Sequence, residues 1–281
     1  MTVKELKSLY REELTSYSKE EADRLFFIFL EEISGISLLQ FLSNSEKEIE
    51  KQQKEQLLLI LNRLQAGVPY QHIVGYTYFS GLKLEVSESA LIPRPETEEL
   101  AYLIKDKVNP KPGLRILDIG TGTGCLALAC AANFKDAVVE AWDISKEALS
   151  LASANAVSNK LQVGFKEVNF LNPQGLPQAD WDIIVSNPPY IGTSEGGVMD
   201  DLVLKNEPHL ALFVPDNDPL VFYNAIADYA KNSLNAGGQI FVEINQRLGE
   251  ETRDVFSEAG FKAELVKDLS GNDRFVIAGK K

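Results

Sequence analysis

The sequence is poor in the side chains that build metal sites and disulfide frameworks. Its 281 residues include two histidines and two cysteines. The cysteines, Cys125 and Cys130, form one pair close in sequence with no second cluster, which fits neither a zinc site nor a set of disulfides. We therefore expect no metal centre, and we expect the chain to work in a reducing compartment, the cytoplasm.

Long apolar runs are missing too. The longest, such as residues 57–61, are far shorter than the ~20 apolar residues that a membrane-spanning helix needs. Residues 1–13 mix charged and apolar side chains and have no apolar core of the kind found in signal peptides. The sequence thus predicts neither a membrane span nor a secretion signal.

Basic residues are fewer than acidic ones. Lys and Arg together number 28 against 41 Asp and Glu, so the formal net charge is −13. Nucleic-acid binding draws most of its affinity from Lys and Arg on phosphates, and this balance counts against a nucleic-acid partner. A local basic patch is still compatible with it. An acidic surface suits a basic protein partner instead.

What is present begins with a helical segment, residues 1–70. Three capping-box patterns, each a Ser or Thr followed three residues later by Glu, stand before stretches with helical apolar spacing. They are Thr2 with Glu5, Ser18 with Glu21, and Ser45 with Glu48. No cluster of catalytic residue types lies in this segment. We interpret it as a small helical bundle that acts as an accessory or substrate-binding domain.

A linker of residues 71–92 is expected to join this bundle to the rest of the chain. Within it, residues 76–86 alternate in polarity around a central turn, as a β-hairpin does. Arg94 follows, held stiffly between Pro93 and Pro95, and Pro95 suits the first position of a helix. A plain surface turn explains these residues as well as a binding role for Arg94 does.

Strands and helices alternate over residues 93–281. Seven segments are predicted to be strands because apolar and β-branched residues dominate them. They are residues 115–119, 137–142, 163–168, 181–186, 239–244, 261–267 and 274–278. Helical segments fill most of the intervals, and a tight turn joins the last two strands. The pattern predicts an α/β domain with a parallel sheet that ends in an antiparallel hairpin.

A glycine-rich turn follows the first of these strands and precedes the first helix of the sheet. It reads Gly120-Thr121-Gly122-Thr123-Gly124. Glycines let the backbone turn sharply and come close to a ligand, and the helix behind them offers free N–H groups. The spacing departs from the Gly-x-Gly-x-x-Gly fingerprint of dinucleotide sites. A purely structural turn is the alternative interpretation.

Asp143, at the end of the second strand, favours ligand binding over that alternative. An acidic residue at this place accepts hydrogen bonds from ribose hydroxyls. No basic residue stands beside it to bind a phosphate, so the two features together indicate a nucleoside cofactor such as S-adenosyl-L-methionine. Glu243 ends the fifth strand and could face the same site, but a carboxylate at a sheet end is often only solvated.

A second motif, Asn187-Pro188-Pro189-Tyr190, comes directly after the fourth strand. It therefore lies at the carboxyl edge of the sheet, where open α/β sheets bind ligands. The Asn187 side-chain oxygen and the Pro188 carbonyl can accept hydrogen bonds from an NH₂ group, and the prolines bring no competing N–H. The Tyr190 ring offers a flat face for a planar group to stack on.

These groups suit the transfer of a methyl group to an amide or an aromatic amine. Such a nitrogen is a weak nucleophile because its lone pair is delocalised. Two hydrogen bonds from its protons would localise the lone pair and aim it at an electrophilic methyl group. A rigid proline turn that only caps the strand is the alternative interpretation.

With these motifs the sequence resembles the HemK/PrmC family over nearly its whole length. Further matches are Leu91 to Glu98, Glu207-Pro208 and Ala211-Leu212. The resemblance implies a seven-stranded, Rossmann-like S-adenosyl-L-methionine-dependent methyltransferase domain after the helical bundle and hairpin linker. It also implies the activity, methylation of the side-chain amide nitrogen of the glutamine in the Gly-Gly-Gln motif of class I peptide chain release factors. We expect the enzyme to be a monomer.

The same resemblance implies the site residues. For the cofactor they are Gly120, Thr121, Gly122, Thr123, Gly124, Asp143, Asn169, Phe170 and Asn187, and for catalysis and substrate Asn187, Pro188, Pro189, Tyr190 and Arg94. Asn169 stands where the family commonly has Asp, and it keeps the capacity to hydrogen-bond. The loop of residues 192–206, which carries Gly196-Gly197, is interpreted as a lid over the substrate.

Two other functions stay open on the residues alone. The Asn-Pro-Pro-Tyr motif also serves methyltransferases that modify adenine N6 or guanine N2 of DNA or RNA, with the base flipped out of a duplex. No basic recognition domain is evident in the sequence to support that alternative. The other is a non-catalytic cofactor-binding or ribosome-associated protein, against which the intact pocket motifs argue.

Overall fold

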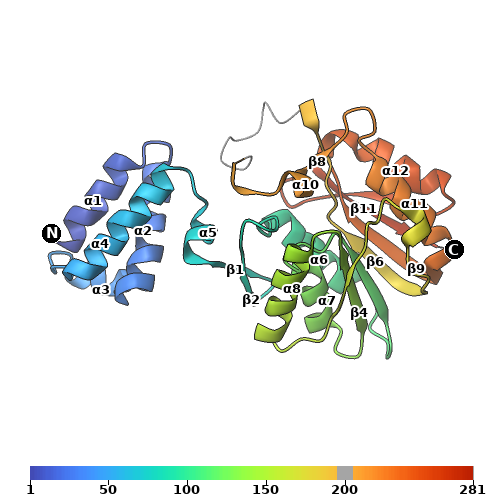
Figure 1. Cartoon of the computed structure of the whole chain (residues 1–281), viewed down its shortest axis with the longest axis horizontal. Helices are drawn as coiled ribbons and strands as arrows, with labels where there is room; N and C mark the ends of the chain where they lie inside the picture. The colour runs from blue at the N-terminus through green and yellow to red at the C-terminus, as the bar shows by residue number, and fades with distance from the viewer. Residues whose placement is uncertain (195–204, 281) are drawn as a thin grey trace. The chain divides into compact units, whose positions relative to one another are not determined.

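The computed structural model describes residues 1–194 and 205–280, and Figure 1 traces them. Contacts between residues divide the chain into two compact units, residues 1–75 and residues 76–281, each with its own buried core. Within the described ranges no helix is long and apolar enough to cross a membrane. The same ranges hold no group of three or more His, Cys, Asp and Glu side chains that could bind a metal ion.

The first unit is a bundle of helices, as the sequence predicts. Its helices are α1 (Val3–Glu13), α2 (Lys19–Ser34), α3 (Leu38–Ser43), α4 (Lys51–Gln65) and the short α5 (Tyr70–Val74). Apolar side chains from α1, α2 and α4 meet in a buried core, and Tyr10 also donates its hydroxyl hydrogen bond to the Leu57 carbonyl at 2.6 Å. Helix α5 was not predicted, because Gly67 and Pro69 indicate a turn there.

Two of the three predicted capping boxes are confirmed, those of Thr2 on α1 and Ser18 on α2. The one predicted at Ser45 is wrong. Helix α4 begins only at Lys51, without a side-chain cap. The backbone of residues 45–49 instead hydrogen-bonds the start of the chain, with Val3 N donating to Lys47 O at 3.0 Å. Pairing between distant backbone segments thus replaces the local cap.

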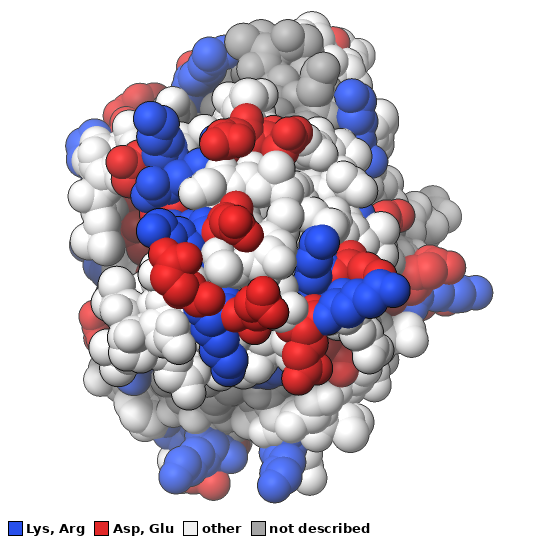
Figure 2. Space-filling model, turned by 90° about the vertical axis from the view of Figure 1, so that its left-hand side faces the viewer, with Lys and Arg blue, Asp and Glu red and all other residues white. Residues whose placement is uncertain are grey.

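Charged side chains of both signs are interspersed on the surface. Figure 2 shows one face of the molecule, on which acidic and basic side chains alternate and no large area has a single sign. Many of them pair, as Arg11 does with Asp23 and Lys4 with Glu46. The excess of acidic residues therefore does not leave this face uniformly acidic.

The second unit is an α/β domain with a seven-stranded sheet. In chain order its elements are β1 (Tyr76–Phe79), β2 (Leu82–Glu85), α6 (Pro95–Lys107), β3 (Arg115–Ile119), α7 (Cys125–Asn133), β4 (Val138–Asp143), α8 (Lys146–Ser158), β5 (Gly164–Glu167), η1 (Pro173–Gly175), β6 (Trp181–Ser186), β7 (Ile191–Gly192), α10 (His209–Leu212), β8 (Phe213–Val214), α11 (Val221–Ser233), β9 (Leu234–Glu243), η3 (Gln246–Leu248), α12 (Gly249–Glu258), β10 (Lys262–Lys267) and β11 (Asp273–Gly279). The predicted strands are all confirmed, with shifts of at most one residue at their ends except in β9, which begins at Leu234, five residues before the predicted start.

The order of strands in the large sheet is β10-β11-β9-β6-β3-β4-β5. Strands β9, β6, β3, β4 and β5 run parallel, and β11 pairs antiparallel with both β9 and β10. This is the parallel sheet with a terminal antiparallel hairpin that the strand pattern predicts, and it agrees with the seven-stranded, Rossmann-like domain that the resemblance implies. Strands β3 and β6 are neighbours with Ile119 opposite Ser186, so the two turns that follow them leave the sheet side by side.

Helices cover both faces of this sheet, as Figure 1 shows. Helices α6, α7 and α8 pack on one face, with Ile116 of β3 in their core. Helices α11 and α12 pack on the other face, with Leu117 of β3 in theirs. Successive strand residues point to opposite faces, so a strand buried on both sides reads as a continuous apolar run. Cys125 and Cys130 are both buried in α7, in agreement with a packing role.

The β1–β2 hairpin belongs to the second unit. A fully buried amide on α8, that of Asn155, ties it to the glycine turn. Asn155 accepts a hydrogen bond from Glu85 N at 2.6 Å and donates to the carbonyls of Glu85 and Thr123, both at 3.0 Å. The hairpin therefore braces the turn where a ligand is expected.

Candidate active site

The glycine turn is fastened to the neighbouring strand β4. Gly120 N and Thr121 N both donate to the Trp142 carbonyl, at 2.8 and 3.1 Å. Gly122 N donates to a carboxylate oxygen of Asp143 at 2.9 Å. Gly120, Gly122 and Gly124 all have positive φ, a conformation that other residues adopt at a cost. The turn thus needs its glycines. Its hydrogen bonds hold the end of β3 against the end of β4.

Gly124 has a packing role that Gly120 lacks. A Cβ atom at Gly124 would lie 3.0 Å from the Cβ of Ala152, whereas no atom of the described residues would contact one at Gly120 within 4 Å. Gly124 is the N-cap of α7, and Ala152 is on α8. The close approach of these two helices therefore depends on a glycine at this point.

We expect Gly124→Ala to destabilise the fold more than Gly120→Ala. Both substitutions carry the strain of a left-handed conformation, about 1–2 kcal/mol. Gly124→Ala adds an overpacking cost of about 1–3 kcal/mol. Urea denaturation of the two variants measures the difference, and equal losses of unfolding free energy would contradict the packing role of Gly124.

Asp118 lies beneath the turn, almost completely buried. One of its carboxylate oxygens accepts hydrogen bonds from Thr121 Oγ1 at 2.6 Å and Ala127 N at 3.1 Å. The other, Oδ1, is buried and has no hydrogen-bond partner among the described residues. Burial raises the pKa of Asp118 to about 7, and the hydrogen bonds offset only part of that effect. An unpartnered carboxylate oxygen thus stands at the pocket wall.

Asp143 ends β4 and holds the tight turn that begins α8. Its Oδ1 accepts from Ser145 N and its Oδ2 from Gly122 N, both at 2.9 Å. A carboxylate has about four acceptor positions, so two backbone donors leave capacity for further donors. Asp143 lines the same pocket as the glycine turn. The sequence prediction placed it there as a partner for hydroxyl groups.

The Asn-Pro-Pro-Tyr turn leaves β6 beside the glycine turn. Asn187 Nδ2 donates to Thr97 Oγ1 on α6 at 2.9 Å. Tyr190 donates its hydroxyl hydrogen bond to Glu243 Oε1 at 3.1 Å, and its carbonyl accepts from Asn245 Nδ2 at 3.2 Å. Contacts to α6 on one side and to the end of β9 on the other therefore fix both ends of the motif.

One pocket joins these features. It is open to solvent on one side, and the turns after β3, β4 and β6 contribute to its wall. The predicted site residues that line it are Gly120, Thr121, Gly122, Thr123, Asp143, Asn169, Phe170, Asn187, Pro188 and Pro189. Further lining residues that the sequence prediction did not name as site residues include Thr97, Asp118, Ile144 and Leu210.

Three predicted site residues do not line this pocket. Gly124 lies behind the turn as the N-cap of α7. Tyr190 is partly buried and packs against the core on the α11–α12 face of the sheet. Arg94 lies just before α6 and forms an ion pair with Glu207, whose side chain is 1% exposed. In the predicted lid, Gly196-Gly197 lies outside the described residues.

The Arg94–Glu207 pair connects two segments that border the pocket. Glu207 Oε1 also accepts from Ile92 N at 3.3 Å. Burial raises the pKa of Glu207, against the opposing effects of Arg94 and the Ile92 hydrogen bond. Leu91 and Pro93 on one segment and Pro208 and Leu210 on the other line the pocket. Arg94 thus shapes the pocket from outside it.

We expect Arg94→Ala to lower the free energy of unfolding by about 2 kcal/mol. Removing one partner of a buried ion pair costs ~3–5 kcal/mol, and the one-third exposure of Arg94 reduces that cost. Thermal or urea denaturation measures it. Lys107→Ala, which breaks the exposed pair with Glu264, is the control and should cost less than about 0.5 kcal/mol. Equal effects would show that Arg94 does not anchor the segment.

Sequence reasoning did not name Thr97 or Asp118 as site residues, and it left open whether Glu243 faces the site or is only solvated. Glu243 is not solvated at the sheet end, because it is 1% exposed. Its Oε2 accepts a hydrogen bond from Thr97 Oγ1 at 2.7 Å. Two features of the sequence pointed to these residues: Glu243 ends a central strand, and Thr97 stands three residues after Arg94. Neither signal indicates which residues meet.

Comparison with known proteins agrees with this geometry. Residues 5–75 match the family model described as the PrmC N-terminal domain, and residues 100–212 match the Methyltransferase small domain. A crystal structure of a methyltransferase from Pyrococcus furiosus has the same fold, with a TM-score of 0.54 and 20% identity, covering 78% of this chain and 98% of that one.

Two bacterial relatives share far more of the sequence, and both are described as "Release factor glutamine methyltransferase". The one from Flavobacterium psychrophilum is 41% identical, over 98% of each chain. The one from Bacteroides thetaiotaomicron is 39% identical, over 94% of this chain and 95% of the relative. With this identity over nearly its full length, the chain belongs to the family of release factor glutamine methyltransferases, the HemK/PrmC family that its motifs resemble.

Proposed function

We propose that this protein transfers the methyl group of S-adenosyl-L-methionine to the side-chain amide nitrogen of the glutamine in the Gly-Gly-Gln motif of class I release factors. The observation that carries the proposal is the single pocket shared by the glycine turn, Asp143 and the Asn187-Pro188-Pro189 turn. Donor and acceptor of a methyl group must meet in one such pocket. The release factor as substrate follows from the family.

The residues present fit S-adenosyl-L-methionine. The unpartnered Asp118 oxygen can accept from an amino group, and the Asp143 carboxylate can accept from ribose hydroxyls. Open space in front of Gly120 lets a ligand approach the backbone. Asn169 and Phe170, also in the pocket wall, can contact the adenine by a hydrogen bond and by packing. When bound, the cofactor supplies an electrophilic methyl group.

The Asn-Pro-Pro-Tyr turn would hold the target amide. Asn187 Oδ1 and the Pro188 carbonyl each accept one hydrogen bond from the glutamine NH₂ group. These bonds localise the nitrogen lone pair and orient it, so positioning and electrostatics provide most of the rate. Tyr190, which does not line the pocket, supports the turn through its hydroxyl. A strong base is unnecessary, because the proton can leave after the methyl group has been transferred.

The remaining expectations concern partners and place of action. We assign residues 1–75 an accessory role in binding the release factor, as the sequence suggested for this helical bundle. We further propose that the enzyme acts as a monomer in the cytoplasm, where translation factors work, and that it has no nucleic-acid partner. The formal net charge of −13 supports that last point, because a nucleic-acid site needs clustered positive charge.

A methylation assay on purified components tests the proposal. The protein is incubated with S-adenosyl-L-methionine and either a class I release factor or adenine- and guanine-containing DNA and RNA. We expect one added methyl group on the peptide that contains Gly-Gly-Gln, found by mass spectrometry, and none on nucleic acid. Methyl transfer to nucleic acid but not to the release factor would replace the proposal with base methylation. Light scattering measures the oligomeric state.

A further inference from the structure

We propose that Thr97 and Glu243 form a hydrogen-bond relay that fixes which end of the Asn187 side-chain amide faces the substrate. In this relay Glu243 is a positioning residue for methyl transfer. It does not touch the reacting atoms but sets the polarity of the group that does. The inference rests on the function proposed above, and it assigns roles to two buried residues that this function leaves unexplained.

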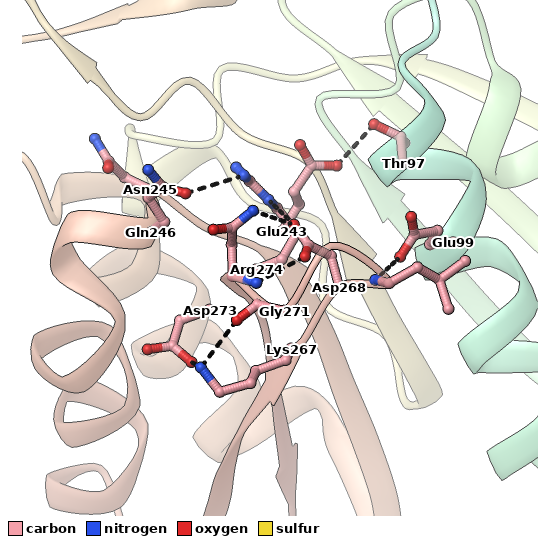
Figure 3. Close-up of polar contacts among 12 residues, drawn as sticks. Thr97, Glu99, Glu243, Asn245, Gln246, Lys267, Asp268, Gly271, Asp273 and Arg274 are labelled. Carbon is pink, nitrogen blue, oxygen red and sulfur yellow. Dashed lines mark hydrogen bonds and ion pairs between the residues drawn. The ribbon is translucent and has the colours of Figure 1, made fainter.

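The relay links three elements that are distant in sequence. Glu243 is the last residue of β9, Thr97 is in the first turn of α6, and Asn187 follows β6. Asn187 Nδ2 donates to Thr97 Oγ1 at 2.9 Å, and Thr97 Oγ1 donates to Glu243 Oε2 at 2.7 Å. Figure 3 shows Glu243 reaching from its strand toward Thr97 on the helix. Thr97 is 2% exposed and Glu243 1%, so the hydrogen bond between them is shielded from water.

The direction of each hydrogen bond follows from the chemistry of a carboxylate. An ionised carboxylate only accepts, so the Thr97 hydroxyl must give its single proton to Glu243. The hydroxyl oxygen then has only lone pairs left for Asn187, which must present its NH₂ group. The amide oxygen Oδ1 is thereby directed away from Thr97. An amide with this orientation can accept a hydrogen bond from a substrate NH₂ group.

The opposite charge state would permit the opposite orientation. If Glu243 Oε2 carries a proton, it can donate to Thr97, and Thr97 can then donate to the Asn187 oxygen. Asn187 would present its own NH₂ group to the NH₂ group of the substrate, and two donors repel. Ionised Glu243 therefore selects the productive rotamer of Asn187.

Glu243 also binds Tyr190, the last residue of the Asn-Pro-Pro-Tyr motif. Tyr190 donates its hydroxyl hydrogen bond to Glu243 Oε1 at 3.1 Å. The same carboxylate therefore accepts from Tyr190, at one end of the Asn-Pro-Pro-Tyr turn, and from Thr97, which binds Asn187 at the other end. The Tyr223 hydroxyl donates to the Glu243 backbone carbonyl at 3.1 Å, which fixes the residue itself. A neutral amide in place of the carboxylate offers only one acceptor oxygen, so it cannot satisfy both donors.

The surroundings of Glu243 allow its charge to change near neutral pH. Among the described residues, the titratable groups around it are Tyr190, Tyr223, Arg274, Glu96 and Cys125, and Thr97 is its hydrogen-bond donor. Arg274 favours the charged form but is engaged by Asp268 at 3.2 Å, as Figure 3 shows. Burial, the largest effect, raises the pKa of Glu243 to about 7. Loss of activity on acidification is therefore expected as pH falls through about 7.

Glu243→Gln tests the relay. We expect kcat for the release factor to fall about 10- to 100-fold, because a misplaced reacting group costs a factor of that order. The dissociation constant for S-adenosyl-L-methionine, measured calorimetrically, should change less than about twofold, because Glu243 does not line the pocket. At saturating S-adenosyl-L-methionine, where titration of Asp118 in the cofactor site does not limit the rate, the fall of kcat below about pH 7 should be present in the wild type and absent in the variant.

Asp182→Asn is the matched control. Asp182 is also a buried carboxylate with several donors, among them Lys111 Nζ, Arg115 N and Asn235 Nδ2, but it lies near the start of β6, away from the pocket. Its substitution should lower thermal stability and leave kcat and its pH profile as in the wild type. An equal loss of kcat in both variants would overturn the relay in favour of general destabilisation.

Substitutions at Thr97 test the middle of the relay. Thr97→Val keeps the shape but removes the hydroxyl, so kcat should fall as in Glu243→Gln. Thr97→Ser restores the hydroxyl and should recover most of that loss. A valine variant as active as the serine variant would overturn the inference.

The side-chain amide signals of Asn187 provide a readout that needs no methyl transfer. In ¹⁵N NMR spectra they should shift as the pH crosses about 7 in the wild type and stay constant in Glu243→Gln. Constant signals in the wild type would overturn the relay even if the release factor is methylated. If the signals shift but no glutamine is methylated, the relay stands as a structural fact and the proposed function fails.

Discussion

Asn187→Ala should lower kcat for glutamine methylation by about 10²- to 10³-fold, the loss that follows removal of one preorganised hydrogen-bonding group. The substitution removes the Oδ1 acceptor that would orient the substrate amide and leaves Thr97 Oγ1 without its donor. The fold should suffer little, because Asn187 is only partly buried and lies on a turn. Single-turnover mass spectrometry of the Gly-Gly-Gln peptide measures the rate, and calorimetry measures cofactor binding.

Asn159→Ala is the control for that experiment. Asn159 also lies at the end of an element and makes two amide hydrogen bonds, to the carbonyls of Lys83 and Asn155 at 2.9 Å, but it lies outside the pocket. Its loss should cost about 1 kcal/mol of stability and leave kcat unchanged. A similar drop in kcat for both variants, or full activity of Asn187→Ala, would contradict the assigned mechanism.

The sequence predicted the place of those parts of the site that consist of consecutive residues. The glycine turn follows a strand and opens a helix within a few residues, so its place at the sheet edge could be read directly. The same holds for Asn187-Pro188-Pro189-Tyr190 after β6. The strand pattern placed both turns at the carboxyl edge of the sheet, and the pairing of Ile119 with Ser186 shows that their strands are neighbours.

The side-chain contacts that hold the site in place could not be predicted from the sequence. Thr97 and Glu243 are 146 positions apart, and Arg94 and Glu207 are 113 apart. A carboxylate at a strand end looks the same in a sequence whether it is solvated or buried. Its burial depends on α6 closing over β9, which is a property of the assembled fold. The wrong cap at Ser45 has the same cause, since the backbone of residues 45–49 pairs with the start of the chain instead of beginning a helix.

Asp143→Ala should weaken binding of S-adenosyl-L-methionine by about 10²-fold. Hydrogen bonds to a charged acceptor contribute about 1.5–3 kcal/mol each, so losing those to ribose hydroxyls amounts to roughly that factor. The variant also loses the acceptor for Gly122 N and Ser145 N, which loosens the glycine turn in the absence of the cofactor. Isothermal titration calorimetry of wild type and variant measures the dissociation constants.

Stability measurements separate the two effects of that substitution. Asp182→Ala removes a carboxylate that likewise accepts from a backbone N–H, that of Arg115 at 2.9 Å, but outside the pocket. Both variants should unfold more easily than the wild type, and only Asp143→Ala should lose cofactor affinity. If Asp182→Ala weakened the cofactor equally, the loss would follow from destabilisation of the sheet. A selective loss instead assigns the effect to the pocket end of the sheet, where Asp143 lines the pocket and holds the glycine turn.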